Sequence, residues 1–327
     1  MLGMALSGFR CLLCGTERSA LRETLHDYAL VQCAGCGFLA RSPASSPAAL
    51  QELYSSRYYG GARAARFRSV LGEWLQGVFR WQRARRLRRA LGGLAGRRVL
   101  DVGCGRGQML AWLQRWGAEV YGTELSKAAA DVAARRLGPS RVVVSELAAA
   151  GFPDGWFNAA TVWHVLEHVP DPVALLREVA RVVTPDGFVY VEVPNAGGWA
   201  ARKLGWHWLG YDAPHHLVHF TPETLRLAGT RAGLVAVKDV HFSWEYSPVT
   251  LLQSLLSAWL GGEHVLFRAL SHAQHDSDPR RRIGCWRVVL HAAAGVALAL
   301  PALLWSVGLG CRRQGDTVGM VFRRSRE

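Results

Sequence analysis

The stretch Val99-Leu-Asp-Val-Gly-Cys-Gly-Arg-Gly107 decides the fold class of this chain. An apolar run that predicts a buried strand ends here in three glycines at alternate positions, and a helical pattern over 107–117 begins at the last of them. Glycine lets the backbone turn sharply and approach a ligand with few side chains in the way. The stretch therefore predicts a strand, a turn and a helix that together bind a ligand at the carboxyl edge of an open α/β sheet.

Beyond this unit, apolar runs alternate with helical patterns, which is typical of βαβ units with a parallel sheet. The expected strands cover 97–102, 118–124, 141–147, 157–163, 187–195, 234–242 and 316–324. The expected helices between them cover 107–117, 126–138 and 172–183. We predict a doubly wound, mostly parallel α/β fold with a seven-stranded sheet.

Glu124 adds a second signal. It follows Gly107 by seventeen residues and ends the second expected strand, where a carboxylate can accept hydrogen bonds from both hydroxyls of a ribose. A dinucleotide-binding Rossmann domain is the alternative, with the glycines contacting a pyrophosphate. The G-x-G-x-G spacing differs from the G-x-G-x-x-G pattern of that class, and the alternative leaves the segments 164–172 and 184–195 unexplained.

Residues 99–107 (VLDVGCGRG) followed by 120–125 (VYGTEL) resemble the first two motifs of the class I S-adenosylmethionine methyltransferases, and the likeness continues to about residue 240. The resemblance implies methyl transfer and S-adenosylmethionine as the cofactor. It assigns the methionine part to the glycine turn and Asp101, the ribose to Glu124, and the adenine to Leu125, Glu146 and Leu147. The implied cofactor-binding set is Asp101, Gly103, Cys104, Gly105, Gly107, Glu124, Leu125, Glu146, Leu147 and Trp163. The family usually has Asp where Glu146 stands, and Phe-Asp where Phe157-Asn158 stands.

The N-terminal part predicts a metal site. Two C-x-x-C pairs, separated by eighteen residues, suit four thiolates around a structural zinc ion; the cysteines are Cys11, Cys14, Cys33 and Cys36. A redox pair or a vestigial knuckle is the alternative. The Ser/Pro/Ala-rich segment 41–50 then marks a boundary. We expect a zinc-knuckle-like segment at 1–45, a linker and helical cap at 46–95, and a methyltransferase domain at 96–327.

Histidines gather in two places after the expected strands. His164 and His168 formally match the H-x-x-E-H pattern of a zinc peptidase, but Pro170 and Pro172 leave no room for the continuous helix that such a site needs. His207, His215, His216 and His219 lie in an aromatic-rich insertion that covers the substrate site in similar methyltransferases. The candidate catalytic residues are His164, His168, His215, His216 and His219, any one of which could accept the proton of the methyl acceptor.

The charge of the chain suggests an alternative acceptor. Lys and Arg number 39 against 25 acidic residues, which gives a net charge of +14, and six arginines fall between Arg80 and Arg89. They lie just beyond an expected amphipathic helix at 67–78. An RNA methyltransferase recruited by the zinc knuckle and these arginines is the alternative function, but we favour a solvated arginine face and no nucleic-acid partner.

An apolar insertion at about 247–314 bears on the acceptor and the location. Residues 288–310 contain no Asp, Glu, Lys or Arg, and the length of this segment suits a membrane-spanning helix. A buried core helix is the alternative. A single crossing would separate 316–324 from its sheet, and arginines flank the run on both sides. We therefore expect a monotopic hairpin bent at Pro301. The expected location is the cytoplasmic face of the inner membrane, and the expected acceptor is a small-molecule, lipid-linked or glycan-precursor compound.

Overall fold

The computed structural model describes residues 9–25, 28–42, 70–212, 215–270 and 284–325. Its main sheet has seven strands in the order β10-β11-β8-β7-β4-β5-β6, which confirms the predicted doubly wound α/β fold. β11 runs antiparallel to β8 and β10, and the other neighbouring pairs are parallel. The strands are β4 (Arg98–Val102), β5 (Glu119–Thr123), β6 (Val142–Val143), β7 (Phe157–Trp163), β8 (Val183–Pro194), β10 (Leu234–Val240) and β11 (Thr317–Arg324).

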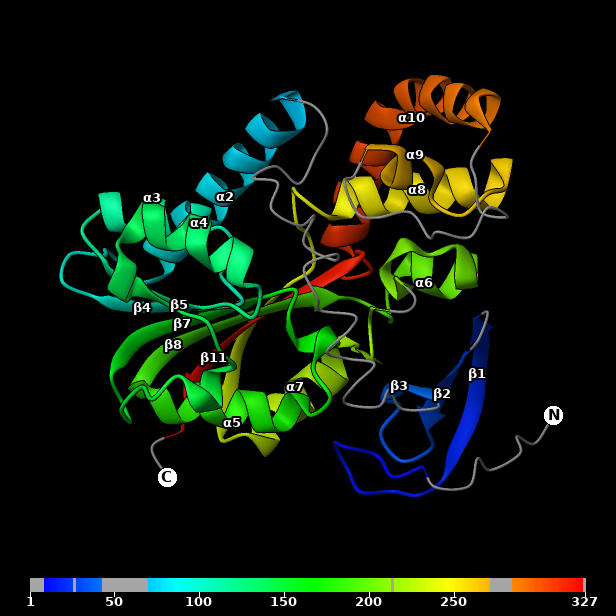
Figure 1. Ribbon diagram of the computed structural model, residues 1–327. Coiled ribbons are helices and arrows are strands. Elements are labelled where there is room, and N and C mark those ends of the chain that lie inside the picture. The colour runs from blue at the N-terminus through cyan, green and yellow to red at the C-terminus, as the bar shows by residue number, and fades with distance from the viewer. Residues whose placement is uncertain (1–8, 26–27, 43–69, 213–214, 271–283, 326–327) are drawn as a thin grey trace.

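Helices cover both faces of this sheet (Figure 1). One face carries α2 (Val70–Ala90), α3 (Gln108–Arg115) and α4 (Lys127–Leu137), and the other carries α5 (Pro172–Val182) and α7 (Pro222–Arg231). Side-chain oxygens of Ser126, Asp171 and Thr221 accept a backbone N–H at the starts of α4, α5 and α7. The central strands β4, β7, β8 and β11 are mostly buried between the two layers, which is why they contain long apolar runs.

β6 and α2 differ most from the predicted ranges, and β8 begins four residues earlier than predicted, at Val183. β6 is two residues long because only Val142 and Val143 pair with β5; the chain then enters the short helix η2 (Leu147–Ala149), whose Leu147 is buried in the core. Helix α2 continues to Ala90, so the arginine run is part of the helix and not a segment beyond it. The first residues of the expected helix at 67–78 lie outside the described residues.

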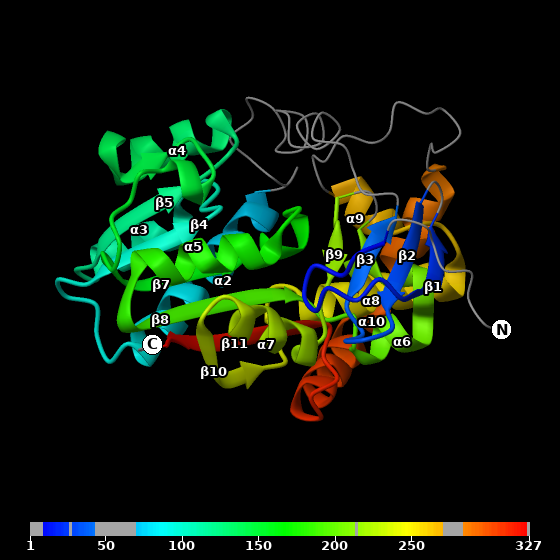
Figure 2. The ribbon, with the colours of Figure 1, turned by 90° about the horizontal axis from the view of Figure 1, so that it is seen from below.

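The N-terminal cysteine segment forms a second sheet with the order β1-β2-β3-β9. Its strands are β1 (Ser19–Leu25), β2 (Tyr28–Cys33), β3 (Leu39–Ser42) and β9 (Val218–His219). The last strand comes from the histidine-rich insertion, and Leu39 pairs with His219 across the antiparallel ladder. Figures 1 and 2 both place β1, β2 and β3 at the end of the molecule opposite α4. The cysteine segment is therefore joined to the insertion by a strand pair.

Two insertions complete the chain. After β8 come α6 (Trp199–Leu204), η4 (Gly205–His207) and η5 (Leu209–Tyr211); between β10 and β11 come α8 (Ser247–Leu260), α9 (Val265–Leu270) and α10 (Cys285–Cys311). A separate apolar core joins these insertions to β2; its members are Leu30, Ala200, Ala201, Trp208, Tyr211, Leu251, Leu255 and Leu309. The helices α6, α8 and α10 thus share one apolar core with strand β2 of the cysteine segment.

The predicted bend at Pro301 is wrong, because α10 is one continuous helix with Pro301 inside it. Its buried face is a single stripe that packs on α8 and α9, and its members are His291, Gly295, Ala302, Ser306 and Leu309. His291 Nε2 also lies 3.0 Å from the Gly261 carbonyl oxygen at the end of α8. Packing from His291 to Leu309, on both sides of Pro301, favours an unbroken helix over a hairpin.

Candidate active site

The glycine turn after β4 contains three residues whose backbone angles disfavour a side chain. Gly103, Gly105 and Gly107 all have φ between 55° and 69°, a region that L-residues with a Cβ rarely adopt. A Cβ on Gly103 would lie 2.5 Å from a methyl carbon of Val165, and one on Gly107 would lie 2.8 Å from Leu137. The turn is therefore a bare backbone cradle between α4 and the segment that follows β7.

Glu124 holds this cradle closed. The backbone N–H of Gly105 donates to its Oε2 at 2.9 Å, and that of Ser126 donates to its Oε1 at 2.8 Å. Burial raises the pKa of this carboxyl group. A carboxylate oxygen can accept two hydrogen bonds, so each oxygen retains capacity for one ribose hydroxyl. The arrangement fits the nucleoside part of S-adenosylmethionine.

Asp101 lies below the turn at the end of β4. Thr161 Oγ1 donates to its Oδ1 at 2.7 Å, and burial raises the pKa of Asp101 to about 6. Cys104 is buried against Gly122 of β5, where a Cβ would lie 2.5 Å from the Cys104 sulfur. These contacts bring the glycine turn and Asp101 together with Glu124.

The residues assigned to the adenine are spread more widely. Leu125 is 48% exposed and Glu146 is exposed, whereas Leu147 belongs to the apolar core under η2. Asn158, where the family usually has Asp, has a structural role: its Oδ1 accepts the backbone N–H of Arg98 at 2.9 Å. Trp163 is buried, and its ring lies 4.4 Å from that of Tyr190.

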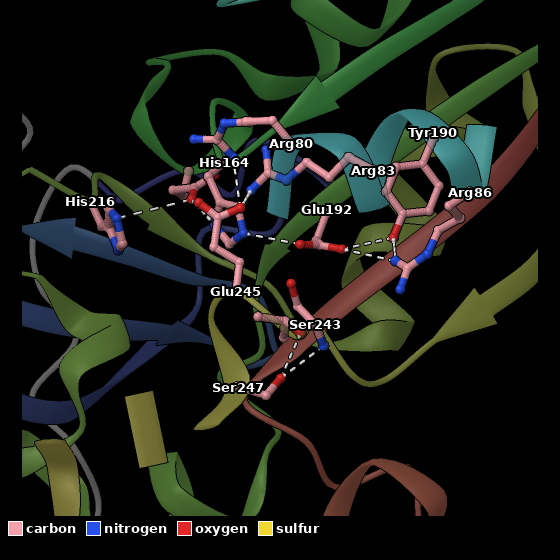
Figure 3. A network of polar contacts seen from close by, with 12 residues as sticks. Arg80, Arg83, Arg86, His164, Tyr190, Glu192, His216, Ser243, Glu245 and Ser247 are labelled. Atoms are coloured by element: carbon pink, nitrogen blue, oxygen red, sulfur yellow. Dashed lines mark hydrogen bonds and ion pairs between the residues drawn. The ribbon is translucent and has the colours of Figure 1, made fainter. Parts of the chain in front are cut away.

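His164 is the centre of a buried charge network (Figure 3). Its Nδ1 lies 3.2 Å from Glu167 Oε1, its Nε2 lies 3.3 Å from Glu192 Oε1, and its ring stacks 3.8 Å from that of Tyr246. Burial opposes the charged form, but Tyr246 and the two carboxylates outweigh it and raise the pKa of His164 to about 10. His164 is therefore protonated near neutral pH, and both of its nitrogens donate to carboxylates.

Arginines of α2 supply the other cations of this network (Figure 3). Arg80 and Arg83 both contact Glu245 Oε2, at 2.7 and 2.6 Å. Arg86 donates to the Tyr190 hydroxyl at 3.0 Å and lies 3.6 Å from Glu192 Oε2. Three of the six arginines thus point inward, so the expected solvated arginine face holds only in part.

Sequence reasoning missed Glu192, Glu245 and Tyr246 as members of this network. A signal for Glu192 did exist, because it is an isolated carboxylate in the apolar strand Val189–Val193. The three-residue spacing of Arg80, Arg83 and Arg86 also places them on one helix face. Nothing local in the sequence pairs that face with β8 or with residue 245.

The remaining candidate histidines gather around Glu167 and Asp212. His216 Nδ1 donates to the Gly210 carbonyl at 2.8 Å, and its Nε2 lies 3.7 Å from Asp212 Oδ2. His168 Nδ1 donates to the His215 carbonyl at 3.1 Å. Burial lowers the pKa of His168 to about 4.

His215 and His219 occupy opposite environments at this cluster. His215 Nδ1 lies 3.3 Å from Asp212 Oδ1, and its side chain is 27% exposed. His219 is buried on β9, where burial lowers its pKa to about 3, and neither ring nitrogen has a hydrogen-bond partner among the described residues. The peptidase pattern is not realised, because His164 lies outside the three-residue helix η3 (Leu166–His168) and contacts Glu192 instead.

The four N-terminal cysteines form a compact cluster. Cys11 and Cys36 have sulfurs 3.5 Å apart, as do Cys14 and Cys33, and the four sulfurs lie within 4.8 Å of one another. All four are free thiols. Four sulfurs at about 2.3 Å from one tetrahedral zinc ion would have similar separations. The geometry fits the predicted thiolate site.

Comparison with known proteins agrees with this geometry. Residues 74–239 match a family described as a methyltransferase domain. A ubiquinone biosynthesis O-methyltransferase of Alkalilimnicola ehrlichii is 43% identical over 112 residues, which are 32% of this chain and 44% of that protein. The protein of the same name from Aeromonas salmonicida is 32% identical over 166 residues, 46% of this chain and 69% of that protein. The alignments thus cover less than half of the first relative and about two thirds of the second.

Solved structures give a weaker likeness. A SAM dependent methyltransferase from Archaeoglobus fulgidus is 19% identical, with a TM-score of 0.45 over 75% of this chain and 94% of that one. The 1,6-didemethyltoxoflavin-N1-methyltransferase of Burkholderia thailandensis is 16% identical, with a TM-score of 0.47 over 93% of this chain and 99% of that one.

Proposed function

Because the chain belongs to the class I S-adenosylmethionine-dependent methyltransferases, we propose that it methylates an oxygen of an amphiphilic small molecule at a membrane surface. The names of the two relatives support oxygen as the acceptor atom and a lipid-type acceptor. The observation that carries the proposal is the exposed apolar face of α10, which stands beside the histidine-rich insertion on the side of α6 and α8 (Figure 1).

The cofactor is held by the residues already described. The bare turn from Gly103 to Gly107 receives the methionine part, Asp101 lies within reach of its amino group, and Glu124 accepts the ribose hydroxyls. Bound S-adenosylmethionine supplies an electrophilic methyl group. The chain itself contributes the orientation of the acceptor and the removal of its proton.

We assign the proton acceptor to the Asp212–His215 pair. Asp212 orients the ring by accepting from Nδ1, so Nε2 is the nitrogen that can take a proton. His215 is the more exposed member of the cluster, whereas His216 and His219 are buried. His164 is protonated already and has a positioning role: with Glu167 and Glu192 it fixes the segment after β7 against the glycine turn.

The apolar surface supports membrane contact without a crossing. On α10, Val296, Leu300 and Leu304 are 82%, 63% and 64% exposed, and Trp259 of α8 is 59% exposed. α10 is long and apolar enough to span a bilayer, but one face packs on α8 and its end leads directly into β11. We therefore propose that α10 lies in the interface at the cytoplasmic face of the inner membrane.

A structural zinc ion at the four cysteines completes the proposal. One member of each C-x-x-C pair is buried, and β3, which follows the second pair, is the strand that pairs with β9. Zinc bound there would fix β3 and therefore the insertion that carries His215 and His216. Nucleic acid is not favoured as an acceptor, because Arg80, Arg83 and Arg86 are engaged by internal partners.

Methyl transfer from labelled S-adenosylmethionine to a fractionated cell extract tests the proposal. We expect the label in an organic-soluble product that carries a new methyl ether. His215→Gln should lower kcat with little change in the affinity for S-adenosylmethionine, whereas the control His207→Gln, outside the cluster, should not. Label in RNA or in water-soluble products would contradict the proposed acceptor, and equal kcat values for the two variants would contradict the assignment of His215.

A further inference from the structure

A second group of metal-ligating side chains lies on the acceptor side of the site. One ligand atom each from Glu167, His168 and His216 can be chosen so that all three lie within 4.8 Å of one another. Glu167 and His168 belong to η3, and His216 precedes β9. Three such atoms from two separate segments converge on one point. They differ from the cysteine cluster in ligand type, since they offer nitrogen and oxygen in place of sulfur.

The hydrogen bonds of His168 and His216 orient their rings in the way that is usual for metal-binding histidines. His168 and His216 both donate from Nδ1 to a backbone carbonyl, at 3.1 and 2.8 Å, which makes Nε2 the nitrogen that can bind a metal ion. An outer hydrogen bond of this kind is a regular feature of metal-binding histidines. The Nε2 atom of each ring is therefore oriented for metal coordination.

Glu167 supplies an oxygen that the protein leaves unsatisfied. Its Oε1 accepts from His164, but Oε2 is buried and has no hydrogen-bond partner among the described residues. A buried, unpaired carboxylate oxygen is costly and calls for a cation or a donor. Asp212 Oδ2, 3.7 Å from His216 Nε2, brings a second carboxylate near the same point. Two carboxylates balance the charge of one divalent ion.

We propose that Glu167, His168 and His216 bind a divalent transition-metal ion of the Zn²⁺ or Co²⁺ type, with Asp212 as an outer partner. Imidazole ligands favour such ions over Mg²⁺ and Ca²⁺, which prefer oxygen alone. Three protein ligands leave a coordination position open. Val165, which packs on Gly103 of the cofactor cradle, precedes Glu167 by two residues, so the ion would lie on the acceptor side of the cofactor. The open position would suit an acceptor oxygen.

Cobalt titration of the zinc-loaded full-length protein tests the site without any methyl transfer. We expect one further equivalent of Co²⁺ per chain, with visible d–d absorption but no thiolate charge-transfer band, because the ligands are nitrogen and oxygen. Excess Zn²⁺ should displace it. Glu167→Gln and the double variant His168→Ala/His216→Ala should weaken Co²⁺ binding at least tenfold. His207→Ala, a matched histidine of the same insertion, should bind as the native chain does.

Folding is checked in each variant by circular dichroism and by calorimetry with S-adenosylmethionine. If the double variant fails to fold, the near-isosteric Glu167→Gln variant decides the question. Absence of a second equivalent in the native chain, thiolate absorption at that equivalent, or unchanged binding by a folded Glu167→Gln variant would each overturn the metal site. These measurements test the metal site independently of the proposed methylation reaction, because none of them requires a methyl acceptor.

Discussion

The Nε2 atom of His164 lies 3.3 Å from Oε1 of Glu192; the Glu192 side chain is buried, and that of His164 is 12% exposed. This contact joins the residue after β7 to the neighbouring strand β8. The backbone N–H of His164 also donates to the carbonyl of Glu192 at 2.8 Å. His164 itself has φ of 52°, an unusual value for a residue with a side chain. The ion pair therefore holds a strained turn in place beside the cofactor cradle.

Replacing His164 should destabilise the fold strongly. His164→Ala leaves the Glu167 carboxylate buried without this cation and leaves Glu192 with Arg86, which should cost about 3–5 kcal/mol in the free energy of unfolding. His164→Asn should cost less, because Asn tolerates positive φ and can donate one hydrogen bond. Urea unfolding of the two variants measures the difference. Equal losses would show that the hydrogen bond and backbone angle matter less than the charge.

The same network predicts how stability depends on pH. The pKa of His164 is raised from 6.5 to about 10, so the folded chain keeps a proton that the unfolded chain loses. The stabilisation is fully present below pH 6.5 and declines as the pH rises toward 10. Unfolding free energies at pH 6, 8 and 10 should fall more steeply for the native chain than for His164→Asn. Parallel pH curves would argue against a protonated His164.

Local sequence signals predicted the geometry of the glycine turn. Gly103, Gly105 and Gly107 are required by the backbone angles of one turn, and Glu124 closes that turn from the next strand, so their placement follows from spacing. The charge network could not be predicted in the same way. Glu245 contacts Arg80 and Arg83 across about 160 residues of chain, and only the folded insertion brings them together. The same holds for the pairing of Leu39 with His219.

The buried carboxyl group of Asp316 should make the free energy of unfolding depend on pH. Trp208 Nε1 donates to its Oδ1 at 3.1 Å, and burial raises its pKa from 3.8 to about 7. Ionising it costs folding free energy, so its contribution is most favourable below pH 3.8 and worsens as the pH rises to about 7. Asp316→Asn keeps an acceptor for Trp208. We expect this variant to be more stable than the native chain at pH 8, by on the order of 2 kcal/mol, and no more stable at pH 4.

Calorimetry with S-adenosylmethionine tests the role of Glu124. Glu124→Ala should lower the affinity by on the order of 1–3 kcal/mol, because the ribose hydroxyls lose their acceptor in a dry pocket. Part of this loss comes from the freed N–H groups of Gly105 and Ser126. Glu124→Gln retains one acceptor oxygen and should lose less. An unchanged affinity in both variants would remove Glu124 from the cofactor site.

Zinc content tests the cysteine cluster. We expect one zinc ion per chain from the four thiolates in freshly purified protein, measured by elemental analysis in the presence of a weak chelator. Cys11→Ser/Cys36→Ser should lose this ion and should loosen the β3–β9 pairing, seen as faster amide exchange in both strands. Cys285→Ser, an exposed cysteine on α10, is the matched control. Zinc well below one equivalent in the native chain would contradict the site.

Vesicle binding tests the membrane contact of α10. Val296 and Leu300 lie on its exposed face, four residues apart, away from the buried stripe that contains Gly295 and Ala302. Val296→Glu/Leu300→Glu removes two apolar side chains from the interface and adds two charges, which should weaken binding to vesicles with anionic lipid by roughly 100-fold. The double variant should still fold, because neither side chain packs in the core.

The matched control for this experiment is a pair of exposed valines on another element. Val235 and Val237 of β10 are each 55% exposed and lie on the edge of the main sheet, so Val235→Glu/Val237→Glu makes the same change in charge elsewhere. It should leave vesicle binding intact apart from a small electrostatic loss. If both double variants bind equally, the arginine-rich surface and not α10 is responsible for membrane contact. If the native chain does not bind vesicles at all, the exposed face of α10 serves another partner and the interfacial proposal is wrong.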